Sequence, residues 1–346
     1  MTVDHRELVL PHGELGGGDS EVSAGAPLRR TGLWRDAFIR FTRNRAALVA
    51  TAIFGVILLY CVIVPFVSPY DPNAVNFKDA YLPVSLEHPF GTDKFGRDLF
   101  TRVAVGGRIS IAIGFAGTLA ILTIGVVYGS IAGFLGGTVD DVLMRLLDAL
   151  YGLPYLPFAI ITTQILSPSG EVTFWTMVAA LTIASWLTTA RIVRGQVTTL
   201  KQNEYVSAAR AVGARWYRIL SRHLLPNTLG VLIIAAFLDL PGVVLGEAFL
   251  SFIGLGINPP KASWGSLAQD GYTAYQSHPY VILIPSLAIA WLILSSVALA
   301  THASASPAGT TTAPSSSATT MSPGITVTPP HAMGPLTANG MRSVWV

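Results

Sequence analysis

Residues 46–67 form an apolar stretch without a single charged side chain. As an α-helix this stretch rises about 33 Å, at about 1.5 Å per residue, which is enough to cross the hydrocarbon core of a bilayer. Only 12% of the 346 residues are charged, whereas about a quarter are charged in a typical soluble domain. The chain is therefore expected to be an all-α integral membrane protein.

Five further apolar stretches bring the expected number of transmembrane helices to about six. These stretches are 109–139, 149–170, 172–190, 224–256 and 280–300. The expected transmembrane domain covers residues 46–300, after an amino-terminal tail, 1–45, that is polar, then basic, and expected to be largely disordered. The glycines Gly125, Gly129 and Gly133 are spaced by four, which gives one helix a small-residue face for close packing against another helix.

The placement of the 22 Lys and Arg residues predicts the orientation in the cell membrane. With the amino end in the cytoplasm, 16 of the 22 lie in inside segments and 6 in outside segments. The opposite orientation would invert this ratio. Both ends of the chain are therefore expected on the cytoplasmic side.

Two acids, Asp239 and Glu247, lie within the apolar stretch 224–256. An ionised carboxylate is costly in lipid, so both acids are expected to face the interior of the helix bundle. They could contact a cation or the amino group of a peptide, or they could accept a hydrogen bond from a neighbouring helix. We favour the structural role for Glu247 and leave the two roles open for Asp239.

No motif of catalysis, nucleotide binding or metal binding is present in the sequence. None of the four lysines follows a glycine, which excludes the Gly-x-x-x-x-Gly-Lys phosphate loop. Seven scattered histidines and one cysteine offer no metal-ligand spacing. The single cysteine, Cys61, is expected to be a small core or lipid-facing residue. We expect no enzyme activity, catalytic residue, metal or cofactor in this chain, so energy for transport must come from a partner chain or an ion gradient.

The polar segment 200–227 is too polar for lipid and favours helix. Residues 204–212 lack glycine and proline, and Gly213 can adopt the left-handed conformation that ends a helix. A second basic stretch, 215–222, then leads to Pro226. Two short helices joined at Gly213 could dock a soluble partner, or could lie in the membrane interface as an amphipathic segment.

This segment resembles the cytoplasmic "EAA" loop of binding-protein-dependent ABC importer permeases, and His223–Leu224–Leu225–Pro226–Asn227 resembles its ending in the peptide-transporter branch. Residues 88–98 resemble the external motif before span two of that branch, and residues 247–265 resemble its span-five exit. Over roughly residues 35–292, the chain is thus similar to the "C-type" permease subunits of dipeptide, oligopeptide and nickel importers. The resemblance implies a type I ABC importer permease-like bundle.

The resemblance implies a coupling loop at 196–223 that inserts into an ATPase subunit. The residues matched to this loop and its ending are Glu204, Ala208, Ala209, Gly213, Leu225 and Pro226. The first position of the usual Glu-Ala-Ala triplet is Ser207 here, which puts the salt bridge of that glutamate in question. The residues matched to the external motif are Gly91, Thr92, Asp93, Gly96, Arg97 and Asp98. Their mixed charge is typical of a solvated face, whereas the family suggests a surface for a substrate-binding protein or a partner permease.

The function implied is a permease subunit of an ATP-driven importer, most directly for di- or oligopeptides. Its implied partners are a second permease, two cytoplasmic ATPase subunits, an extracytoplasmic substrate-binding protein and the lipid bilayer, and no nucleic acid. The alternative is an ion-coupled secondary transporter or channel that uses Asp239 and Glu247. Internal repeats, which that class often shows, are not visible in the sequence.

After residue 300 the composition changes abruptly. Of the 46 residues in 301–346, 33 are Ser, Thr, Pro, Ala or Gly, and Arg342 is the only charged one. Such a segment buries too little apolar surface to fold and is expected to be disordered. Because the resemblance fades around residues 291–295, we hypothesise a reading-frame shift or an altered end in the gene.

Overall fold

The structure, a computed structural model, describes residue 42 and residues 44–304. Within these residues it is helical, and Thr92 and Asp98 form one isolated β-bridge. Five helices are long and apolar enough to cross a membrane: α2 (Arg45–Val67), α3 (Leu99–Leu135), α6 (Phe174–Leu200), α9 (Leu225–Phe252) and α11 (Tyr280–Ser304). The expectations for residues 1–41 and 305–346 lie outside the described residues.

The expected third span is not one continuous helix. In place of one helix over 149–170, the chain forms α4 (Gly137–Tyr151) and α5 (Tyr155–Leu166), which are bent by 92° relative to each other. The break falls at Gly152 and Pro154, because proline disfavours helical backbone in the residue before it. At about 1.5 Å per residue, α5 rises only about 18 Å and cannot cross the hydrocarbon core alone. The described residues therefore hold six spans only if this pair is one of them.

Two helix boundaries differ from the sequence prediction by about ten residues. Helix α3 begins at Leu99 and not at residue 109, and α6 continues to Leu200 and not to residue 190. Ion pairs contribute to both extensions, because Arg102 and Arg194, which hydropathy reads as loop residues, are paired with acids. Arg102 lies 3.5 Å from Asp93 at the start of α3, and Arg194 pairs with Asp140 near the end of α6.

Among the described helices, α3 packs most extensively against α6. The contact is made by the expected small-residue face. A Cβ atom on Gly125 would lie 2.8 Å from the Thr189 side chain, and one on Gly133 would lie 2.7 Å from the carbonyl oxygen of Arg194. A Cβ atom on Gly129 would overlap the carbonyl oxygen of Ala190. These glycines let two backbones approach closely, which confirms that the face serves helix packing.

A second contact region joins α2, α3, α9 and α11 around Trp264, the first residue of α10 (Trp264–Tyr272). The Trp264 side chain is fully buried and donates a hydrogen bond from Nε1 to the carbonyl oxygen of Val103 at 2.8 Å. Cys61 packs against the same site beside Gly107 and is 2% exposed. This confirms Cys61 as a core residue.

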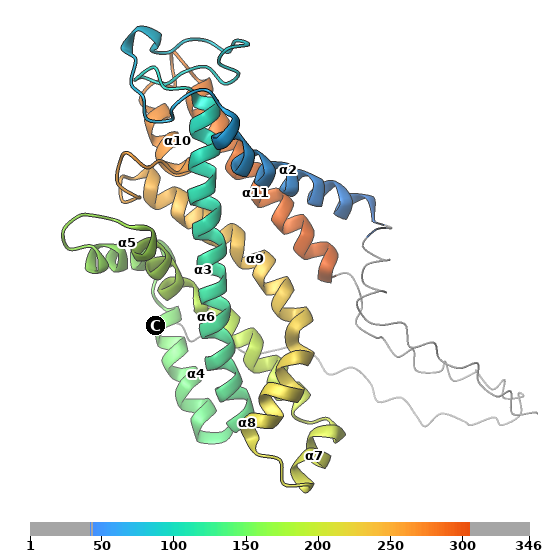
Figure 1. The fold of residues 1–346 in the computed structure, drawn as a ribbon. Helices are drawn as coiled ribbons and strands as arrows, with labels where there is room; N and C mark the ends of the chain where they lie inside the picture. Colours follow the sequence, from blue (N-terminus) through green and yellow to red (C-terminus); the bar gives the residue numbers. More distant parts are fainter. Residues whose placement is uncertain (1–41, 43, 305–346) are drawn as a thin grey trace, which may run out of the picture. The chain divides into compact units, whose positions relative to one another are not determined.

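The two ends of the bundle carry different structures (Figure 1). The segment 68–98 and α10 lie at one end, and the short helices α7 (Glu204–Ala211) and α8 (Trp216–Ile219) lie at the other. The helices α2 and α11 pack side by side along one flank. The motif at 88–98 and the hairpin segment 200–227 are thus separated by the length of the bundle (Figure 1).

Candidate functional site

The segment 201–224 forms the expected pair of short helices joined at a glycine. Gly213 has φ +82°, the left-handed conformation. The backbone N–H of Gly213 bonds to Arg210 O at 2.9 Å, and that of Ala214 bonds to Ala209 O at 3.0 Å. These two bonds are the Schellman arrangement that ends a helix and reverses the chain. The sequence-predicted turn at Gly213 is therefore present.

A buried apolar cluster attaches these helices to the bundle. Its members come from α3, α6, α7, α8 and the π-helical segment Leu220–Leu224, and they are Phe134, Val193, Val197, Val206, Ile219, Leu220 and Leu224. Val206 is the one residue of α7 that is fully buried. Phe134, at the end of α3, contacts the ring of Trp216 with 6.2 Å between centroids, and the guanidinium of Arg210 lies 5.5 Å from its ring. A displacement of α7 and α8 would therefore move side chains that contact Phe134 at the end of α3.

Lys201 makes a second connection between this segment and α3. Its ammonium group donates to the carbonyl oxygens of Gly133 at 3.1 Å and Phe134 at 3.0 Å. The last carbonyls of a helix have no partner within the helix, and a cation is favourable there. Sequence reasoning missed Lys201, Phe134 and Trp216, because their roles depend on contacts between distant helices.

The side of the segment that faces away from the bundle carries both polar and apolar exposed side chains. Glu204, Ala208, Gly213 and Pro226 are exposed, and Ala209 and Leu225 are half-buried. Tyr205, Val212, Trp216 and Tyr217 are exposed large apolar side chains on the same segment, and Val212 is 89% exposed. The positions matched to the coupling loop therefore lie at the surface. Buried residues between them, such as Val206, attach the segment to the bundle.

The external motif is not a solvated face, which corrects the reading from charge alone. Thr92, Asp93 and Asp98 are buried. Asp93 accepts hydrogen bonds from the backbone of Phe95 at 2.8 Å and of Arg97 at 3.0 Å, and from Arg97 Nε at 2.7 Å. The acids are tolerated in the interior because each is bonded several times over.

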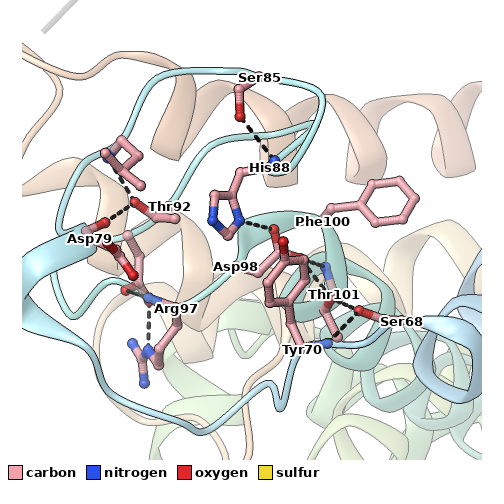
Figure 2. Close-up of polar contacts among 12 residues, drawn as sticks. Ser68, Tyr70, Asp79, Ser85, His88, Thr92, Arg97, Asp98, Phe100 and Thr101 are labelled. Carbon is pink, nitrogen blue, oxygen red and sulfur yellow. Dashed lines mark hydrogen bonds and ion pairs between the residues drawn. The ribbon is translucent and has the colours of Figure 1, made fainter.

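Asp98 holds the motif to the start of α3 (Figure 2). Its Oδ1 lies 3.0 Å from Nδ1 of His88, and its Oδ2 accepts from the backbone and the hydroxyl of Thr101 at 2.8 and 2.6 Å. Asp98 is therefore the N-cap of α3. Thr92 donates to the carbonyl oxygen of Asp79, and its own hydroxyl accepts from Leu82 N at 2.7 Å.

The two glycines of the motif have positive φ, +72° at Gly91 and +70° at Gly96. A Cβ atom on Gly91 would lie 2.6 Å from the carbonyl oxygen of Leu82, and one on Gly96 would overlap the carbonyl oxygen of Asn76. Only glycine fits both the backbone conformation and the space. The motif residues thus build one turn at the end of the bundle opposite α7 and α8 (Figure 1).

The two acids of α9 lie in separate environments. Glu247 is 0% exposed and accepts from Ser110 Oγ of α3 at 2.7 Å and from Ser251 Oγ at 2.6 Å. Ser110 in turn accepts from the backbone N–H of Trp264 at 3.1 Å, so Glu247 links α3, α9 and α10. Asp239 is half-buried and accepts from Thr189 of α6 at 2.8 Å. Among the described residues, no three His, Cys, Asp or Glu side chains gather into a metal site.

Comparisons with known proteins identify the family of the chain. Residues 125–306 match the model of the family "binding-protein-dependent transport system inner membrane component", and residues 32–83 match the "N-terminal TM domain of oligopeptide transport permease C". The family match continues past residues 291–295, where the resemblance was expected to fade. It ends close to the last described residue of α11.

Several curated proteins are similar to the chain over most of its length. The oligopeptide transport system permease protein OppC of Bacillus subtilis is 43% identical over 73% of this chain and 82% of its own length. The dipeptide transport system permease protein DppC of the same organism is 41% identical over 74% and 79%, and OppC of Escherichia coli is 40% identical over 73% and 83%. A solved chain of the MetNI methionine ABC transporter is similar to 57% of this chain and 94% of its own, with a TM-score of 0.46 and 18% identity. By the family match and the identity to these permeases, the chain belongs to the family of binding-protein-dependent transport system inner membrane components.

Proposed function

We propose that the chain is a permease subunit of an ATP-driven importer of di- or oligopeptides, in which residues 46–300 line the membrane pathway together with a second permease. The observation that carries the proposal is the α7–Gly213–α8 hairpin, which is anchored through Val206 and exposed on its outer face. The relatives named as oligopeptide and dipeptide permeases support the substrate class. They also disfavour the alternative of an ion-coupled transporter that uses Asp239 and Glu247.

The hairpin serves as the coupling element for one of two cytoplasmic ATPase subunits, which hydrolyse the ATP. Its exposed apolar side chains, with Val212 foremost, fit an apolar cleft on a protein partner. Closure of the ATPases moves α7 and α8 as a rigid body. Phe134 and Lys201 pass this movement to the end of α3. Of the proposed coupling segment 196–223, residues 196–200 belong to α6, so the moving part begins at Lys201.

The proposed coupling role also sets the orientation. The hairpin must face the cytoplasm, which places the external motif outside and the start of α2 inside. Arg210, Arg215, Arg218 and Arg222 in the segment 204–224 agree with a cytoplasmic location. The turn 91–98 and α10 then face the substrate-binding protein and the outer part of the partner permease.

Co-purification of the ATPase subunits tests the proposal. The chain is extracted from its own membranes with its partners, as wild type, as Gly213→Val and as Gly195→Ala. Valine at φ +82° costs about 1–2 kcal/mol and removes the turn, so we expect Gly213→Val to lose most of the ATPase. Gly195 is an exposed helical glycine with open space around it, so Gly195→Ala should retain the ATPase.

A second variant separates docking from folding. Val212→Asp leaves the Schellman turn in place and changes only the most exposed apolar side chain of the hairpin. We expect Val212→Asp to weaken ATPase association while the thermal unfolding of the chain stays unchanged. Full ATPase retention in both variants, or uptake driven by an ion gradient without ATP, would contradict the proposal.

A further inference from the structure

A cavity of about 780 Å³ opens at the outer end of the bundle. Its walls are the loop around residues 94–97, the end of α5 with the connection to α6, and the segment 254–262 after α9. Lys94 and Asp270 form an ion pair at 2.9 Å, which joins the loop to α10. Asn258 accepts from the backbone N–H of Val172 at 3.0 Å, which joins the other two walls. These two contacts hold the walls of the cavity together. Its volume of about 780 Å³ is typical of small-molecule sites.

The charged side chains of the lining are mainly basic. Four of them are cationic, Lys94, Arg97, Arg102 and Lys261, and one, Asp270, is anionic. Asp270 pairs with Lys94 and lies 3.6 Å from Arg97. Lys261 is exposed and makes no ion pair with any residue that the structure describes. The lining has an excess of positive charge that one carboxylate would reduce.

Two buried polar atoms of the lining have no hydrogen-bond partner among the described residues. They are Nε of Arg102 and Oγ of Ser167. Arg102 is 4% exposed and Ser167 is 5% exposed. Arg102 donates from Nη1 to the carbonyl oxygen of Pro72 at 2.8 Å, and its Nε lies 3.5 Å from Asp93 without the geometry of a hydrogen bond. A buried donor without an acceptor is costly, and the two atoms come from different elements that line the same cavity, α3 and the end of α5.

We propose that this cavity binds the carboxylate end of a short peptide on its way into the membrane pathway, an inference that rests on the proposed function. Lys261 and Arg102 attract the carboxylate, and the Ser167 hydroxyl donates to an oxygen of the peptide. Phe95, Leu255 and Ile257 in the lining offer apolar surface for its side chains. The negative charge of Asp270 repels the carboxylate, so removal of this charge should tighten binding of the peptide acid.

The test uses the transporter assembled from both permeases and the ATPases, in nanodiscs without the substrate-binding protein. Two probes are compared by titration, tri-alanine with a free carboxylate and tri-alanine amide. We expect the acid to bind about tenfold tighter than the amide, as for one hydrogen bond to a charged group. Lys261→Gln should remove most of this preference, whereas Lys78→Gln should not, because Lys78 is an exposed lysine of the segment 68–98 that does not line the cavity.

Two more variants keep the test independent of folding defects. Ser167→Ala removes one unpartnered hydroxyl and should lower the affinity for both probes. Asp270→Asn frees Lys94 from its ion pair, while Arg97 stays paired with Asp93, and should tighten binding of the acid alone. Thermal unfolding of each assembled variant is measured in parallel.

Equal affinity for acid and amide in the wild type overturns the proposal, and so does an equal effect of Lys261→Gln and Lys78→Gln. A third outcome also overturns it. If neither peptide binds, but Lys261→Gln abolishes the stimulation of the ATPase that follows addition of the binding protein to the nanodiscs, the carboxylate belongs to a loop of that protein. In each of these outcomes the ATPases remain associated, whereas failure of the proposed function would appear as their absence from the purified complex.

Discussion

The ammonium group of Lys201 lies 3.0 Å from the carbonyl oxygen of Phe134 and caps the end of α3. Lys201 follows the last residue of α6 and precedes α7 by three positions. One side chain thus connects the hairpin segment to a membrane helix that is distant in sequence.

Replacement of Lys201 by methionine should weaken this connection while leaving the exposed face of the hairpin unchanged. A hydrogen bond to a charged group contributes about 1.5–3 kcal/mol, so we expect a lower unfolding temperature and reduced peptide uptake per ATP hydrolysed. ATPase association should persist. Lys78→Met, in an exposed lysine of the outer loop, is the matched control, and equal uptake per ATP in both variants would contradict the role of Lys201.

The packing of α3 on α6 predicts a strong effect at Gly129. A valine there would overlap the carbonyl oxygen of Ala190 and force the helices apart, and overpacking costs about 1–3 kcal/mol. Gly129→Val should therefore lower the unfolding temperature in detergent. Gly55→Val is the control, because Gly55 is exposed on α2 with open space around it. If Gly55→Val destabilises as much as Gly129→Val, close packing is not the cause.

Two substitutions of Glu247, by glutamine and by leucine, should differ in their effect on stability. Gln keeps an acceptor for Ser110 or Ser251, whereas Leu leaves both buried hydroxyls without it. An unsatisfied buried polar group costs about 1–3 kcal/mol. We expect Glu247→Leu to unfold at a clearly lower temperature than Glu247→Gln, and Glu247→Gln to retain uptake. Loss of uptake in a stable Glu247→Gln variant would instead indicate a direct role of the charge in transport.

The long helices could be predicted well, because lipid demands both a minimum length and apolar side chains. The stretch 46–67 corresponds to α2 within one residue. Helix ends that carry charge could not be predicted in this way. Arg102 and Arg194 read as loop residues in the sequence, and only the fold brings Asp93 and Asp140 to them. The 92° bend between α4 and α5 was missed because α4 carries four charged residues, Asp140, Asp141, Arg145 and Asp148, and hydropathy therefore reads most of it as a loop.

The candidate sites could be predicted as segments, but the interactions within them could not. The turn at Gly213 follows from the spacing of glycine between two helix-forming stretches, and it is present. The burial of Asp93 and Asp98 reverses what their charge suggests, because their partners come from the folded turn and from α3. Phe134 and Arg102 carry no local signal, since each acts through contacts with distant segments.

Cross-linking from Val212 tests the account most directly. Cys61 is the single cysteine of the chain and is buried, so Val212→Cys and Leu86→Cys each add one exposed thiol, on the hairpin and on the outer loop. A short thiol-to-amine cross-linker is applied to membranes that hold the whole transporter, and adducts are identified by mass spectrometry. We expect Val212→Cys, and not Leu86→Cys, to form an adduct with a nucleotide-binding ATPase subunit. An ATPase adduct at Leu86 alone, or at neither position while the ATPase co-purifies, would contradict the docking of the hairpin.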